Sequence, residues 1–138
     1  MMKQLTHMRD FVEHYLHVLS SRDICAIQNF FAEEVDWYVP GNEGLVSWIG
    51  TRSTKDEILD FFADLWKQTQ PLTARIDHIL VDGNFAVVGG EFSSKILRSE
   101  KTLNSIFSIQ LTVENGFITR YRFLEDSYAV SEAYKLDH

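Results

Sequence analysis

Proton transfer is the chemistry that the histidine and carboxylate side chains of this sequence could perform. His78 lies in a segment with strand-like alternation, and imidazole suits proton transfer near neutral pH. A partly buried, hydrogen-bonded structural histidine is the alternative interpretation. Glu91 follows the pair Gly89-Gly90, where a β-bulge would turn its carboxylate toward the interior, although a strand glutamate more often faces solvent. Both residues are candidate bases.

Metal and cofactor chemistry find little support in the residue pattern. His14-x-x-His17 lies within one helical turn, but no Cys, Asp or Glu cluster with ligand spacing completes a metal site. Surface histidines are the better interpretation. There is no glycine-rich phosphate loop, no G-x-S-x-G nucleophile elbow and no plausible cysteine nucleophile. We therefore expect no metal and no cofactor.

Charge and composition limit the partners and the compartment. The 138 residues carry a net charge of −7 without a Lys/Arg cluster, which disfavours nucleic acid and anionic membranes. The single Cys25 excludes an internal disulfide and fits a reducing compartment. No signal peptide and no run of about 18 apolar residues occurs. We expect a cytoplasmic protein with one domain over residues 1–138.

Two helices and a short strand are expected at the start of the chain. Residues 5–20 carry apolar side chains at helical spacing. A second helix begins after Asp23, whose carboxylate can accept bonds from the free N–H groups of the first turn. That helix leads into a short strand that holds Trp37 and Val39.

A glycine-rich loop and a third helix follow. The loop, residues 40–52, contains the large apolar residue Trp48, which is typical of a loop that folds over a pocket mouth or a partner. Thr54-x-x-Glu57 is a capping box that begins the third helix, and Pro71 marks its end.

Beyond the third helix the hydrophobic period changes from 3.6 to 2. The expected elements are strands at 74–82, 85–97, 102–113 and 117–125, and a closing helix at 127–135. Gly89-Gly90 would bend the second of these strands. The order predicts an α+β fold in which three N-terminal helices pack in the concave face of a curved antiparallel sheet. Such a cone rarely closes completely, so we expect an internal pocket.

Three stretches within this order of elements carry a family resemblance. They are FFAEEVDWYVP after Tyr15 to Asp23, IGTRSTKDEILDFF, and the ending NGFITRYRFLEDSYAV. Over nearly its whole length the chain resembles the nuclear-transport-factor-2-like (NTF2-like) superfamily, particularly small bacterial members related to ketosteroid isomerase and the SnoaL-like polyketide cyclases. The resemblance implies a cone-shaped α+β barrel whose apolar pocket hosts an acidic base and a hydrogen-bonding oxyanion site.

The resemblance also implies roles for individual positions. The oxyanion tyrosine of ketosteroid isomerase falls on Tyr15, but its base position falls on Val39 and its second acid at or near Ile109. Asp36 points to the other face of its strand and cannot replace the base. Because two of the three catalytic groups are missing, ketosteroid isomerisation is disfavoured.

The cyclase and epoxide-hydrolase branches place an acid on or just after the last strand. One face of that strand carries Phe117, Tyr121, Phe123 and Glu125. If this aromatic series faces the pocket, Glu125 is the inward acid, and Phe123 occupies a position that is often acidic in these branches. A solvated strand-end carboxylate is the alternative for Glu125. Asp126 is most simply the N-cap of the closing helix.

The first functional hypothesis is a pocket for a hydrophobic, carbonyl-containing small molecule. Tyr15 would polarise the carbonyl oxygen, and Glu125, His78 or Glu91 would move the adjacent proton in an isomerisation or cyclisation. The expected ligand-binding residues are Trp37, Val39, Trp48, Phe62, Trp66, Phe92, Phe107, Ile109, Tyr121 and Phe123.

The second hypothesis is a non-catalytic ligand-binding or dimerisation module on the same fold. The outer face of the sheet could pair across a two-fold axis to form a homodimer, through Asn104, Ile106, Ser108, Gln110, Thr112, Arg120 and Arg122. The two hypotheses differ in geometry. An enzyme needs a carboxylate or histidine within reach of the ligand space that Tyr15 also reaches.

Overall fold

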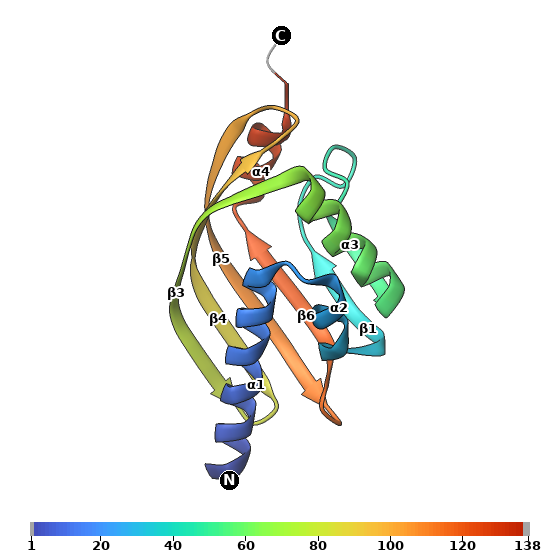
Figure 1. Cartoon of the computed structure of the whole chain (residues 1–138), viewed down its shortest axis with the longest axis vertical. Helices are drawn as coiled ribbons and strands as arrows, with labels where there is room; N and C mark the ends of the chain where they lie inside the picture. Colours follow the sequence, from blue (N-terminus) through green and yellow to red (C-terminus); the bar gives the residue numbers. More distant parts are fainter. Residues whose placement is uncertain (1, 137–138) are drawn as a thin grey trace.

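The computed structural model describes residues 2–136 (Figure 1). In chain order the elements are α1 (Met2–Ser21), α2 (Ile24–Ile27), the 3₁₀ turn η1 (Gln28–Phe30), β1 (Phe31–Val39), β2 (Gly50–Thr54), α3 (Lys55–Gln68), β3 (Thr69–Asp82), β4 (Phe85–Ile96), β5 (Lys101–Glu114), β6 (Phe117–Glu125) and α4 (Ser127–Tyr134). Figure 1 shows α1, α2 and α3 on one side of the curved sheet. The predicted α+β fold is confirmed.

All six strands form one sheet in the order β2-β1-β6-β5-β4-β3, which leaves β2 and β3 as edges and does not close. Strand β1 runs parallel to β6, and the other neighbouring pairs are antiparallel. The expectation of an antiparallel sheet is therefore wrong for this pair. Hairpin turns set the relative direction of consecutive strands only, and β1 and β6 are far apart in sequence.

Several boundaries differ from those expected. The second helix ends after one turn, so β1 begins at Phe31 instead of near Trp37. Strand β2 lies partly within the segment expected to be a loop. Helix α3 ends at Gln68, and Pro71 lies inside β3. A proline is tolerated there because β3 is an edge strand.

The predicted helix caps are present. The side chain of Asp23 caps α2, and Thr54 with Glu57 forms the reciprocal capping box of α3. Asp126 accepts a hydrogen bond from the backbone N–H of Ala129 at 3.0 Å, as expected for the N-cap of α4. Each cap satisfies backbone donors that a helix start leaves free.

The double glycine of β4 allows a close approach of two backbones. Opposite it, the register of β3 shifts between Ile76 and His78. A Cβ atom at Gly90 would overlap the carbonyl oxygen of Arg75. The irregularity therefore lies in β3 and not in β4, so it does not turn Glu91 inward.

Strand β6 contains one extra residue near its start. Val113 pairs with Ile118 and Thr112 with Arg120, so two steps along β6 oppose one step along β5. The bulge reverses the side-chain alternation. Ile118 is fully buried and Phe117 is 44% exposed. The prediction that Phe117 faces inward is therefore wrong.

Candidate functional site

A cavity of about 530 Å³ lies between the helices and the concave face of the sheet, a size that suits a small organic ligand. Its aromatic wall comprises Trp48, Phe61, Phe62, Trp66, Phe92, Phe107, Tyr121 and Phe123. Its polar lining residues are His17, Ser20, Arg22, Thr69, Thr73, Ser93, Ser94 and Glu125. Trp48 is only 3% exposed, packs edge-on against Tyr134 and lines the cavity, so this residue of the loop points inward.

Glu125 is the one Asp or Glu among the described residues that line this cavity. It ends β6 and pairs with Phe107 of β5. Although the residue keeps partial exposure, its Oε2 atom is buried and has no hydrogen-bond partner among the side chains that the structure describes, those of residues 7–136. Removal from water, with a smaller contribution from Asp126, raises the pKa of Glu125 to about 8. Near neutral pH the carboxyl is therefore mostly protonated, and it becomes a base at mildly alkaline pH.

The alternation of β6 places Tyr121, Phe123 and Glu125 together on the concave face, and all three line the cavity. At roughly 3.3 Å per residue, the Cα atoms of Tyr121 and Glu125 lie about 13 Å apart. Extended side chains from these two positions can therefore contact two parts of one ligand.

Two buried tyrosines share a hydrogen bond at the cavity wall. The hydroxyl oxygens of Tyr15 and Tyr121 lie 2.7 Å apart. The indole of Trp37 stacks on the Tyr121 ring, with centroids 4.4 Å apart. Burial raises the pKa of both hydroxyls, so both stay protonated. Because one of the two protons forms the bond between them, the other is free to donate elsewhere.

Tyr15 itself lies behind the wall. It is fully buried, and among the described residues it is Tyr121 and not Tyr15 that lines the cavity. The structure therefore places Tyr15 outside the cavity lining, next to Tyr121, to whose hydroxyl it is hydrogen-bonded. The sequence signal for Tyr121 was its position on the same strand face as Glu125.

The other two candidate bases, His78 and Glu91, lie outside the cavity. Both are exposed. Glu91 forms an ion pair with Arg75 at 3.1 Å, and Arg75 also pairs with Asp77. Phe92 lines the cavity, so the neighbouring Glu91 points to the opposite face of β4. Neither candidate can act on a ligand bound in the cavity.

Eight of the ten predicted wall residues line the cavity, and the exceptions are Trp37 and Val39. Val39 is fully buried and Trp37 is 1% exposed, so both belong to the core beneath the wall. An apolar side chain therefore occupies the position where ketosteroid isomerase keeps its base, and it is not at the cavity surface.

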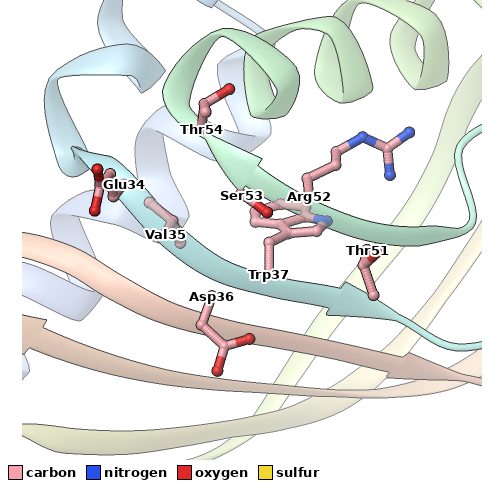
Figure 2. Close-up of a pocket in the computed structure, with 8 residues that line it drawn as sticks. All are labelled: Glu34, Val35, Asp36, Trp37, Thr51, Arg52, Ser53 and Thr54. Atoms are coloured by element: carbon pink, nitrogen blue, oxygen red, sulfur yellow. The ribbon is translucent and has the colours of Figure 1, made fainter.

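Trp37 instead borders a second, more open depression along β1 and β2 (Figure 2). Figure 2 shows Asp36 on the opposite side of β1 from Trp37. Its carboxylate is paired with Arg122 at 3.0 Å and with Arg120 at 3.7 Å. Apart from Val35 and Trp37, the residues that line this depression are polar or charged, so the cavity is the better candidate for an apolar ligand.

Arg22 is a polar lining residue that sequence reasoning missed. It follows α1 with a left-handed backbone, φ 55°. Its Nη1 donates to the carbonyl oxygens of Trp66 and Thr69 at 3.3 and 2.9 Å, and its Nη2 donates to Thr69 Oγ1 at 3.0 Å. Partial burial lowers the pKa of the guanidinium. These partners are more than 40 positions away in the chain, so no local pattern marks the residue.

The described part of the chain contains neither a metal-ligand cluster nor a bilayer-spanning helix. Among residues 2–136, no group of three or more His, Cys, Asp or Glu side chains is arranged to hold a metal ion. His14 packs edge-on against Phe30, with ring centroids 5.0 Å apart. In the same part of the chain, no helix is long and apolar enough to cross a bilayer.

Solved structures share this fold at low sequence identity. An NTF2-like protein from Burkholderia xenovorans LB400 matches with a TM-score of 0.84 and 15% identity over 95% of this chain and 98% of that chain. TerC, co-crystallised with polyporic acid, matches with a TM-score of 0.78 and 22% identity over 92% and 97%. A provisionally assigned isomerase from Rhodopseudomonas palustris has a TM-score of 0.72 and 14% identity over 78% and 79%. No curated protein matches.

The sequence profile of the SnoaL-like domain matches residues 12–121. This range runs from α1 into β6 and ends at Tyr121, on the cavity wall. The structural neighbours share the fold of NTF2-like proteins. The chain therefore belongs to the SnoaL-like domain family, with an NTF2-like fold.

Proposed function

We propose that this protein binds a hydrophobic, carbonyl-containing small molecule in the cavity and catalyses proton transfer at the carbon next to the carbonyl. One observation carries the proposal: Glu125 is a carboxyl beside the aromatic wall of the cavity, with its pKa raised to about 8. A base of this strength is well matched to work near neutral pH. Isomerisations and aldol-type cyclisations both use such a step.

The proposed step uses side chains of this chain alone. Tyr121, supported by Tyr15, donates a hydrogen bond to the carbonyl oxygen. The Glu125 carboxylate takes a proton from the adjacent carbon, and the electron pair of the broken C–H bond forms an enolate whose oxygen stays bonded to Tyr121. Glu125 then returns the proton to another carbon and is again a carboxylate. TerC, co-crystallised with polyporic acid, supports a small organic ligand, and the provisionally assigned isomerase supports an isomerisation.

Removing the Tyr121 hydroxyl tests this proposal. We expect Tyr121→Phe to slow the exchange of the protons next to the carbonyl of 2-tetralone by about 100-fold, because one oxyanion donor contributes about that much. The measurement is proton NMR of the ketone in D₂O. The matched control is Tyr15→Phe, which breaks the same tyrosine pair but keeps the cavity hydroxyl, and we expect roughly a tenfold smaller loss. An unchanged rate in Tyr121→Phe contradicts the assignment.

We also propose that the outer face of the sheet pairs with a second copy. On β5 the residues that point to this outer face are Asn104, Ile106, Ser108, Gln110 and Thr112. The residues between them point to the core side of the sheet. Ile106 is 67% exposed and Leu80 of β3 is 63% exposed. Large apolar side chains exposed on a broad sheet face favour burial against a partner.

A charge at the centre of this face tests the homodimer. We expect sedimentation velocity to give the mass of a dimer for the wild type and of a monomer for Ile106→Glu, because an uncompensated carboxylate would be buried across the two-fold axis. Circular dichroism controls for folding. A monomeric wild-type protein at micromolar concentration contradicts the proposal.

A further inference from the structure

Arg22 is the only arginine or lysine among the described residues that line the cavity. Its guanidinium is partly buried. Within residues 2–136, it forms no ion pair with a carboxylate, and its three hydrogen bonds all go to the neutral oxygens of Trp66 and Thr69. A positive charge therefore lines the cavity without a counter-ion.

The hydrogen bonds of Arg22 do not use all its donors. A guanidinium has five N–H groups, and three are directed to Trp66 and Thr69. The remaining two can form the paired contacts with a carboxylate or phenolate for which a guanidinium is suited.

The other polar residues of the cavity do not neutralise this charge. Glu125, its one acidic residue among those described, is mostly uncharged near neutral pH. The hydroxyls of Thr73 and Ser93 bond to each other at 2.6 Å. The described cavity lining therefore offers Arg22 no anionic partner near neutral pH.

The position of Arg22 also argues against a purely structural residue. Its φ of 55° lies in the left-handed region that glycine or asparagine usually occupies after a helix. Joining α1 to the end of α3 needs hydrogen-bond donors only, whereas the arginine adds a permanent charge to an aromatic cavity.

Resting on the proposed function of the cavity, we propose that its ligand is an organic anion whose ionised oxygen, a carboxylate or an acidic phenol or enol, pairs with Arg22. Arg22 approaches from the helix layer and Glu125 from the end of β6. The anionic group is held on the helix side of the cavity, and the reacting carbon faces the sheet. The aromatic wall holds the apolar body of the ligand.

Two probes of nearly equal shape test the charge. Isothermal titration calorimetry at pH 7 compares 2-naphthoate with the neutral 2-naphthamide. We expect the wild type to bind the carboxylate about tenfold or more tightly, as charge-assisted hydrogen bonds imply. Arg22→Met, which keeps the apolar stem, is expected to bind both probes equally, and Arg22→Lys to keep part of the preference. Arg98→Met, which removes a guanidinium that lies over Tyr134, is expected to keep the wild-type ratio.

The outcomes separate this inference from the proposed function. If the wild type binds the two probes equally, the inference that the ligand is an anion is wrong. Binding of both probes still supports the proposal that the cavity binds an aromatic small molecule. A preference that persists in a folded Arg22→Met overturns the role of Arg22. If that variant does not fold, the wild-type ratio and Arg22→Lys decide the question. Binding of neither probe overturns both the inference and the proposed cavity function.

Discussion

Replacing Glu125 with glutamine is expected to slow proton exchange next to the carbonyl of 2-tetralone by about 1,000-fold, within the range for loss of a general base. Glutamine has nearly the same shape as the glutamic acid that fills this site, but it cannot accept the proton. We therefore expect the affinity for the ketone to change only a few-fold. Proton NMR in D₂O gives the exchange rate, and calorimetry gives the affinity.

The pH dependence of the same reaction identifies the group. Because the carboxylate is the active form and the pKa of Glu125 is about 8, the wild-type rate is expected to rise with pH and to level off above that value. The Glu125→Gln profile is expected to be flat after the hydroxide background is subtracted. If Glu125→Gln exchanges the protons at the wild-type rate, Glu125 is not the base.

Asp126→Asn is the matched control for Glu125→Gln. Asparagine can still accept the hydrogen bond from Ala129 and cap α4. The neighbouring negative charge contributes to the raised pKa of Glu125, so removing it is expected to move the midpoint of the profile to lower pH. The maximal rate is expected to stay within a few-fold of the wild type. Loss of activity comparable to that of Glu125→Gln would mean that the assignment has confused the two acids.

The sheet side of the cavity could be predicted because strand alternation is local. Tyr121, Phe123 and Glu125 follow the period of two, and a short turn at Asn115-Gly116 fixes the direction of β6. The same period placed Phe117 wrongly, because a bulge reverses the alternation between it and Arg120. A bulge depends on pairing with the neighbouring strand, which no residue pattern within β6 displays.

The helix side of the cavity could be predicted less well. The helical spacing of α1 shows that Tyr15 is buried but not whether it lies in the wall or behind it. Arg22 reaches the cavity through contacts with residues 44 and 47 positions away. The exposure of His78 and Glu91 follows from which face of the sheet the helices cover, and this is a tertiary property.

The buried carboxyl is also expected to make folding stability fall as the pH rises, and this is the second large effect. The ordinary pKa of Glu125 is 4.5 and the folded pKa is about 8. Between these values the folded protein holds a proton that the unfolded chain has released, so raising the pH favours unfolding. The contribution is fully present below pH 4.5 and is lost as the pH passes 8. Glutamine at this position removes the contribution of Glu125 to the pH dependence of stability.

The full pKa shift of Glu125 corresponds to at most about 5 kcal/mol of folding free energy. Because the residue is partly exposed, the expected loss of stability is about 3 kcal/mol. The measurement is the free energy of unfolding by urea at pH 5, 7 and 9, followed by tryptophan fluorescence, for the wild type and Glu125→Gln. The quantity to compare is the difference in the free energy of unfolding between the wild type and Glu125→Gln at each pH. The lowered pKa values of Glu57 and Asp77 affect both proteins equally and cancel in this difference. The wild-type value is expected to fall toward and below that of the variant as the pH rises. Parallel curves would show that Glu125 ionises freely in the folded state and is not the buried base that the proposed reaction needs.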